Sequence, residues 1–185
     1  MKKLFLSEQP RHACNVLNRI KKIEIRKTKP TCNLPNEVLM YCTKQQDIIK
    51  LNRYAKDEFV LERNFNEEDF EIMNSGYTAK GCVVARFNLK KVEKIEWHDS
   101  EGMFDDPGYR TETMDEETIL RLSCLSREEL YDYLQNKGEG YAWYIEDLVV
   151  FDKPIPLEAF GLERGPQSYG YIELKSSEEV ENENS

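Results

Sequence analysis

The sequence has no long hydrophobic run. No apolar stretch in its 185 residues approaches the roughly 20 residues that a membrane-spanning helix needs. The basic N-terminal segment MKKLFLSEQP has an apolar run of only Leu4, Phe5 and Leu6, far short of the roughly 7–15 residues of a signal-peptide core. We therefore expect no membrane partner, a cytoplasmic location and a first β-strand in this segment.

Closely spaced cysteine pairs are also missing. The five cysteines, Cys14, Cys32, Cys42, Cys82 and Cys124, include no C-x-x-C pair, whereas a zinc site or a disulfide framework needs paired spacing. The sequence therefore predicts reduced cysteines, mostly buried as small apolar side chains. Histidine is scarce too, and the group of His98, Asp99 and Glu101 is too small for a metal site. We expect neither a metal nor another cofactor.

Positive charge is in deficit overall but not everywhere. The net charge is −9, yet residues 1–53 hold twelve Lys and Arg against four Asp and Glu, a balance of +8. The remaining residues hold fourteen against thirty-one, a balance of −17. A protein this acidic is poorly suited to coating DNA without regard to sequence. It can still present one basic face.

The N-terminal half predicts strands with a single helix and one elaboration. A helix over 10–20 can start at Pro10 and has a regular apolar side. A charged strand over 22–26 and an apolar strand over 37–43 follow. Residues 44–79 predict a loop-and-helix elaboration in which 47–56 is helical.

The C-terminal half begins with a strand over 81–95, followed by an acidic elaboration over 97–116. A helix over 116–125 precedes Ser126, which forms a capping box with Glu129 and opens a second helix that ends near Gly138. Strands over 140–151 and 169–174 close the fold. The acidic segment 176–185 has nothing to bury and is expected to be disordered.

This order of elements predicts an α+β fold. Several long strands with few helices, and no regular βαβ alternation, favour a small mixed β-barrel of about five to six strands flanked by short helices over a doubly wound sheet. We expect a single domain over residues 1–175.

The most unusual stretch is KKIEIRKTKP, residues 21–30. Alternation places Ile23 and Ile25 on one side of the strand and Lys22, Glu24 and Arg26 on the other. The charged side is either an ordinary solvated strand face or the floor of a pocket that reads a polar, planar ligand. A carboxylate there can accept from an exocyclic amine, and arginine can donate to a carbonyl or phosphate.

Five segments together resemble the ASCH family of the PUA-like superfamily, and in particular its small phage and prophage members. They occur in the family's order: QPRHACNVLNRIKKIEIRKTKP, VLMYCTK, GCVVARFNLKKVEKI, LSCLSREELYDYLQNKGEGYAWYIEDLVVFDKPIPLEAF and RGPQSYGYIEL. The chain departs from the family pattern at Arg19, Lys22 and Tyr169-Gly170, where Gly, Thr and Trp-Cys are usual.

The resemblance implies a PUA-like β-barrel with a cradle between the barrel and the first helix. In this superfamily the cradle is associated with RNA, modified bases or nucleosides. Some small ASCH members are amidohydrolases that act on N4-acetylcytidine through a lysine, a threonine and a glutamate. The lysine falls on Lys21, and Glu24 occupies the threonine position.

Further ligand-binding candidates lie on the last two strands. Tyr141 and Trp143 share one side of their strand and are either core residues or stacking platforms for a base. Gln167 and Ser168 precede the last strand, where they can form a turn or bond to a base edge. Ser168 has no nearby base that would make it a nucleophile. His12 is expected near the cradle rim, and Tyr41 and Thr43 are weaker candidates.

Three functions follow as hypotheses. The leading one is a binding module that captures a nucleobase, nucleoside or RNA, using Lys21, Lys22, Glu24, Arg26 and Trp143. The second is an amidohydrolase of an acylated nucleoside, in which Lys21, with a lowered pKa, and Glu24 form the catalytic pair. The third is a phage accessory protein that binds a host protein through acidic loops at 62–74 and 99–117.

Overall fold

A computed structural model describes residues 2–52, 58–63, 77–99, 106–136 and 138–173. The expected acidic tail and most of the acidic loop at 62–74 lie outside these residues, as do residues 100–105 of the second acidic loop. None of the helices in the described parts is long and apolar enough to cross a membrane.

The largest layer is a mixed sheet of five strands in the order β11-β7-β3-β1-β12. β1 and β3 pair in parallel, and the other neighbours are antiparallel. The strands are β1 (Lys2–Glu8), β3 (Asn36–Cys42), β7 (Cys82–Leu89), β11 (Glu146–Pro156) and β12 (Tyr169–Glu173). The apolar run Leu4-Phe5-Leu6 is fully buried in β1, because this strand is central and covered on both faces.

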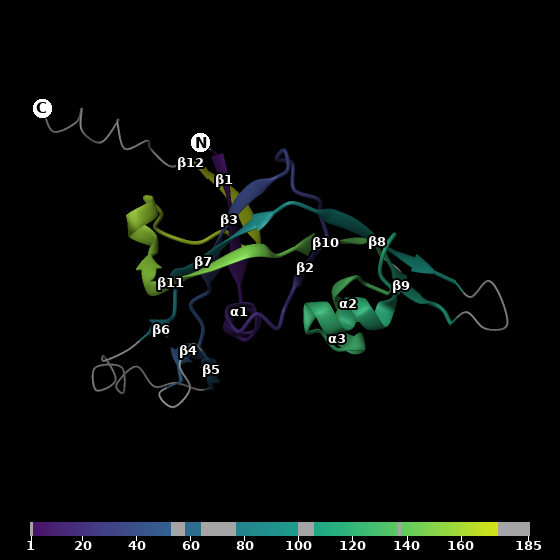
Figure 1. Ribbon diagram of the computed structural model, residues 1–185, viewed down its shortest axis with the longest axis horizontal. Coiled ribbons are helices and arrows are strands. Elements are labelled where there is room, and N and C mark those ends of the chain that lie inside the picture. Colours follow the sequence, from purple (N-terminus) through teal and green to yellow (C-terminus); the bar gives the residue numbers. More distant parts are fainter. Residues whose placement is uncertain (1, 53–57, 64–76, 100–105, 137, 174–185) are drawn as a thin grey trace, which may run out of the picture.

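A second sheet has four antiparallel strands in the order β2-β10-β8-β9. These are β2 (Ile23–Arg26), β10 (Gly140–Tyr144), β8 (Val92–His98) and β9 (Gly108–Arg110). The chain runs directly from a strand of one sheet into a strand of the other between β7 and β8 and between β10 and β11 (Figure 1). Between β10 and β11, Ile145 N donates to Lys22 O over 2.9 Å. The two sheets therefore curl into one half-barrel, and the α+β mixed-barrel prediction is confirmed.

The first helix, α1 (Pro10–Leu17), starts at the expected proline and buries Ala13, Val16 and Leu17. It ends earlier than predicted, because Arg19 adopts a left-handed conformation with φ of 59°. Ile20 is consequently 58% exposed rather than part of the apolar side.

Two further helices, α2 (Glu116–Ser123) and α3 (Arg127–Tyr133), lie against the second sheet (Figure 1). The Asp115 side chain accepts from Thr118 N and caps α2. The predicted capping box of Ser126 and Glu129 is present at the start of α3. A short 3₁₀ helix, η2 (Leu157–Phe160), follows β11.

The described residues of the elaboration at 44–79 form strands. β4 (Ile48–Leu51), β5 (Phe59–Glu62) and β6 (Thr78–Ala79) form a three-stranded sheet in the order β5-β4-β6. The predicted helix over 47–56 is therefore wrong at 48–51, and residues 53–57 lie outside the described ranges. Asn18 holds this sheet against α1, since its side chain donates to Phe59 O over 2.7 Å and accepts from Phe59 N over 2.8 Å.

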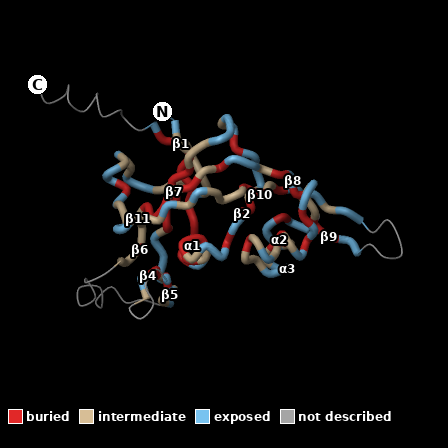
Figure 2. The backbone as a smooth tube through the Cα atoms, viewed as in Figure 1, coloured by how far each residue is buried: buried red, intermediate tan, exposed pale blue. Residues whose placement is uncertain are grey.

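The core has two main parts, one on either side of β2. One lies between the five-stranded sheet and α1 and includes the fully buried Trp143. The other lies between the second sheet and helices α2 and α3, and it receives Ile23 and Ile25. Figure 2 shows buried residues at β1, β7 and α1 and again around β8 and β9. The charged side of β2 therefore lies between two packed layers.

Candidate functional site

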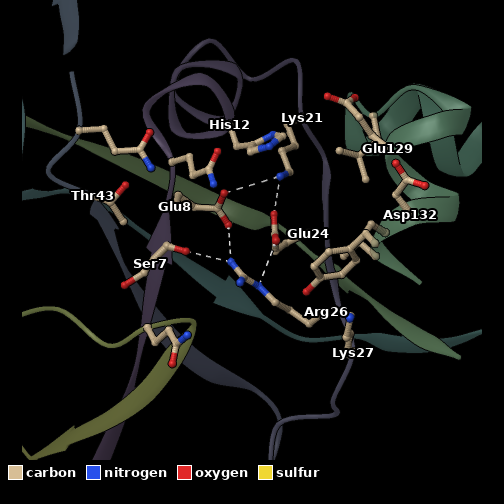
Figure 3. Close-up of a pocket in the computed structure, with 16 residues that line it drawn as sticks. Ser7, Glu8, His12, Lys21, Glu24, Arg26, Lys27, Thr43, Glu129 and Asp132 are labelled. Carbon is tan, nitrogen blue, oxygen red and sulfur yellow. Dashed lines mark hydrogen bonds and ion pairs between the residues drawn. The ribbon is translucent and has the colours of Figure 1, made fainter. Parts of the chain in front are cut away.

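Alternation in β2 sorts its side chains as predicted. Ile23 and Ile25 pack toward the helices, while Glu24 and Arg26 point the other way, toward β1 and α1 (Figure 3). Lys22 does not join them, because it precedes the strand, its backbone N–H bonds to Leu122 O and its side chain is exposed. Lys21 does join them and is 3% exposed.

Lys21, Glu24, Arg26 and Glu8 form a closed ring of alternating charges. Lys21 Nζ pairs with Glu24 Oε2 and lies 3.7 Å from Glu8 Oε2. Arg26 completes the ring, with Nε 3.0 Å from Glu24 Oε1 and Nη2 2.8 Å from Glu8 Oε1. Two cations and two carboxylates balance each other, which is how a protein can hold four charges out of water.

Arg26 is also fixed from outside the ring. Its Nη1 donates to Ser168 Oγ over 3.0 Å and its Nη2 donates to Ser7 O over 2.9 Å. The guanidinium N–H groups therefore also bond to protein groups of β1 and of the segment before β12. Its role is to position the two carboxylates.

The lysine and Glu24 are both charged at neutral pH. Burial opposes ionisation of Glu24, but Lys21 and Arg26 outweigh it and lower the pKa of Glu24 to about 2. Burial also opposes the charge of Lys21, yet Glu24 and Glu8 outweigh it and raise the pKa of Lys21 above its usual 10.5. The lowered lysine pKa expected from the sequence is therefore wrong, because the carboxylates dominate the neighbouring cations.

Glu8 is the group of the ring that titrates near neutrality. Complete burial and the negative charge of Glu24 raise the pKa of Glu8 from 4.5 to about 7, against the opposing effect of Lys21 and Arg26. The ring can thus gain or lose one proton at Glu8 under physiological conditions while Glu24 stays ionised.

The ring forms the floor of a cavity of about 690 Å³ between β1, α1, β2 and α3 (Figure 3). Sites for small molecules commonly measure roughly 300–1,000 Å³. The wall includes Glu129 and Asp132 from α3, and Arg11 Nη1 on α1 lies 2.5 Å from Glu129 Oε1 across the mouth. The lining residues are Ser7, Glu8, Gln9, His12, Lys21, Glu24, Ile25, Arg26, Lys27, Thr43, Gln45, Leu125, Glu129, Asp132, Tyr133 and Gln167.

Four buried polar atoms of the lining have no hydrogen-bond partner among the described residues. Glu24 Oε2 and Arg26 Nε belong to ion pairs of the ring, but His12 Nδ1 and Thr43 Oγ1 have no ion-pair partner either. Burial and the nearby positive charge of Lys21 lower the pKa of His12 to about 4, so the imidazole is neutral and able to accept a hydrogen bond. Buried polar atoms without partners are uncommon. In a cavity wall they point to a ligand that supplies the missing bonds.

The aromatic residue that lines the cavity is not the one predicted. Trp143 is fully buried in the core and packs edge-on against Tyr169 at a centroid distance of 4.9 Å, so its ring does not line the cavity. Tyr141 is half-buried and also packs against that core. The tyrosine that does line the cavity is Tyr133, which is 36% exposed and has Lys27 Nζ 5.2 Å from its ring centroid.

Of the other candidates, Gln167 lines the cavity and Ser168 lies behind it as the partner of Arg26. Three exposed glutamines, Gln9, Gln45 and Gln167, also line the cavity, and their side-chain amides make no hydrogen bond with any described residue. His12 and Thr43 also line it, whereas Tyr41 is buried in a separate cluster.

Neither Glu8 nor Tyr133 was predicted from the sequence as part of the site. Glu8 ends an apolar strand, where a charged residue is common, and its contacts come from residues 13 and 18 positions away. Tyr133 is the last residue of α3 and faces Arg26 only because α3 packs beside β2. Both assignments depend on tertiary contacts.

Neither a protein-family model nor a curated protein sequence matches the chain. Solved structures do match its fold. The ASCH protein of Zymomonas mobilis superposes with a TM-score of 0.56 at 15% identity, covering 98% of this chain and 93% of that one. A tyrosine-to-phenylalanine variant of it gives 0.56 at 15% identity over 100% and 97% of the two chains, and a serine-to-alanine variant gives 0.55 at 15% over 98% and 94%. The chain therefore has the fold of an ASCH protein.

Proposed function

We propose that this chain is a binding module whose cavity captures a nucleobase, as a free base, a nucleoside or part of an RNA. The observation that carries the proposal is the pair of buried lining atoms, His12 Nδ1 and Thr43 Oγ1, that have no hydrogen-bond or ion-pair partner among the described residues. His12 Nδ1, Thr43 Oγ1 and the three glutamine amides supply donors and acceptors above a charged floor. Amide side chains suit the paired donor and acceptor on a base edge.

The floor and the wall complement this chemistry. Each oxygen of Glu8 and Glu24 has one ion-pair partner in the ring, which leaves a second lone pair to accept from an exocyclic amine. Tyr133 lines the cavity and is 36% exposed. Stacking a base on an aromatic ring contributes about 1–3 kcal/mol.

A thermal-shift panel of natural and modified nucleosides, run on wild type and two variants, tests the proposal. At a hundred times its dissociation constant a ligand adds about 2.7 kcal/mol of stability. Glu24→Gln should abolish the shift. Tyr133→Ala should weaken binding roughly 5–150-fold if one stacked base is lost, whereas Tyr133→Phe keeps the ring and should bind like wild type.

The proposal fails if no nucleoside or base shifts the wild-type transition. It also fails if Tyr133→Ala and Glu24→Gln respond like wild type, because the ligand would then bind elsewhere.

One observation favours a second candidate, hydrolysis of an acylated nucleoside such as N4-acetylcytidine. Glu8, with a pKa of about 7, lies 3.7 Å from the protonated Lys21. Ionised Glu8 would take a proton from water as the water oxygen attacks the acyl carbon, and Lys21 would stabilise the oxyanion. Transfer of that proton to the departing amine would release acetate and cytidine. Lys21 is thus an electrostatic group rather than a nucleophile.

Incubation with N4-acetylcytidine separates the two candidates. Acetate release that is lost in Glu8→Gln identifies an enzyme. Unchanged nucleoside after long incubation with excess protein rules out this hydrolysis and leaves the binding module.

A further inference from the structure

We infer that the loop over 27–31 guides the phosphate backbone of a single-stranded nucleic acid whose base occupies the cavity. This inference rests on the proposed function and narrows its ligand from a free nucleoside to a base within a chain. The loop leaves β2 directly after Arg26, so it starts at the edge of the cavity.

The loop carries two lysines without an ion-pair partner in the described part of the chain. Lys27 and Lys29 are exposed and form no ion pair with a described residue. Lys27 lines the cavity beside Arg26 (Figure 3), and Lys29, two residues further along the loop, is not among the lining residues. Lys2 lies next to the far end of the loop, with its Nζ 5.0 Å from the ring centroid of Tyr171.

Two tyrosines of β12 hold this loop in place. Tyr169 OH lies 3.0 Å from Thr28 Oγ1, and Tyr171 OH accepts from Thr31 N over 2.8 Å. The hydroxyls therefore fix the backbone on both sides of Lys29. A held loop presents its cations at defined positions, as a binding surface for phosphates requires.

The floor of the cavity has no spare positive charge for a phosphate while Glu8 is ionised. Lys21 and Arg26 are already balanced by Glu8 and Glu24. The α3 side of the mouth carries Glu129 and Asp132, and only Glu129 has a cationic partner, Arg11, among the described residues. Phosphates are thus disfavoured at the floor and along α3, whereas the loop over 27–31 carries lysines, unpaired among the described residues, from the edge of the cavity outward.

The test compares a nucleoside that binds in the cavity with a five-nucleotide single-stranded RNA of the same base, titrated across salt concentrations. The RNA should bind wild type more tightly than the nucleoside does. Lys29→Glu should weaken RNA binding. It should also reduce the slope of log affinity against log salt by about 0.7, which corresponds to the loss of one phosphate contact. It should leave nucleoside affinity unchanged. Lys153→Glu, at an exposed lysine of β11, is the matched control and should bind RNA like wild type.

Two results would overturn the inference and leave the proposed function standing. One is an RNA that binds no more tightly than its nucleoside. The other is a Lys29→Glu slope equal to that of wild type or of Lys153→Glu. Failure of every nucleoside to bind would instead remove the proposed function, and this inference with it.

Discussion

At the scale of single residues, the site consists of charges that are buried but balanced. Lys21, Glu8, Glu24 and Arg26 have side chains no more than 11% exposed, and each contacts two oppositely charged partners. Such a ring adds little net stability over an apolar core of equal volume, but it penalises the loss of any one member. A ring of buried charges that adds little stability and lies at the floor of a cavity suggests a role beyond packing.

Removing Arg26 should be severe. Arg26→Met leaves Glu24 and Glu8 each without one cation and should lower the free energy of unfolding by about 3–5 kcal/mol. Arg86→Met is the matched control, since the Arg86 side chain is 43% exposed and pairs with Glu37, and such a pair contributes about 0–1 kcal/mol. Urea titration of both variants measures the difference. Equal losses would contradict a balanced buried ring.

The pH dependence of stability should reveal two opposing groups. Glu8 has its pKa raised from 4.5 to about 7, so stability present below pH 4.5 is lost as the pH rises toward 7. His12 has its pKa lowered from 6.5 to about 4, so stability present above pH 6.5 is lost as the pH falls toward 4. Between pH 4.5 and 6.5 the two effects oppose each other.

Single variants should separate the effects of Glu8 and His12 on the pH dependence of stability. On acidification from pH 6.5 to 4.5, Glu8→Gln should lose stability relative to wild type, because the His12 effect remains. His12→Gln should gain stability relative to wild type over the same range, because the Glu8 effect remains. Denaturant midpoints at several pH values measure both slopes. Slopes of the same sign in the two variants would contradict the assignment.

Residue-level prediction from sequence succeeded where the period of the strand decides the outcome. Alternation placed Glu24 and Arg26 away from Ile23 and Ile25, as the structure has them. It could not assign Lys22, which lies before the strand begins. It also could not decide how deep a residue lies on the correct side. Trp143 pairs with Glu24 across β10 and β2, yet it belongs to the core.

At the scale of elements, α1 and the small sheet beside it depend on each other. Asn18 follows α1, and its amide bonds both backbone polar groups of Phe59, as a neighbouring strand would. The helix therefore positions β5, and β5 covers part of the helix. Because Phe59 is 8% exposed, its backbone groups have little access to water when the amide is removed.

Asn18→Ala should lower the free energy of unfolding by about 1–3 kcal/mol, because it leaves the Phe59 N–H without a partner and Phe59 O with only the thiol of Cys14, 3.5 Å away. Asn18→Asp keeps the acceptor for Phe59 N but places a carboxylate oxygen against Phe59 O, so it should not restore the wild-type stability near neutral pH. Denaturant unfolding checks both. A loss below 0.5 kcal/mol in Asn18→Ala would show that the amide is dispensable.

Element prediction succeeded for α3 and failed for β4, and the reason is physical. The capping box is a local signal that needs only Ser126 and Glu129. The apolar residues of 47–56 fit a helical spacing as well as a strand with both faces covered. Ile48 and Ile49 are both fully buried in β4, so packing against neighbouring elements selected the strand.

At the scale of the whole molecule, the two sheets share continuous stretches of chain. The segments 82–98 and 140–156 each contribute a strand to both sheets. If these strands leave one sheet, the strands that continue from them in the other sheet are disrupted as well. The two core parts flanking β2 should therefore unfold together.

The two tryptophans report on the two core parts separately. Trp143 lies in the first, and Trp97 packs against Tyr109 and Tyr131 in the second. Trp97→Phe and Trp143→Phe each leave one reporter. In each variant the fluorescence and circular-dichroism midpoints should coincide in urea. Midpoints that differ in one variant would show that a core part unfolds alone.

The most direct test of the central claim is a crystal structure of the protein with the nucleoside that gives the largest thermal shift. The account predicts the base in the cavity above Glu24, with its edge in hydrogen-bond contact with His12 Nδ1 or a lining glutamine and its face against Tyr133. A base bound elsewhere, with the ring of Lys21, Glu24, Arg26 and Glu8 untouched, would contradict it.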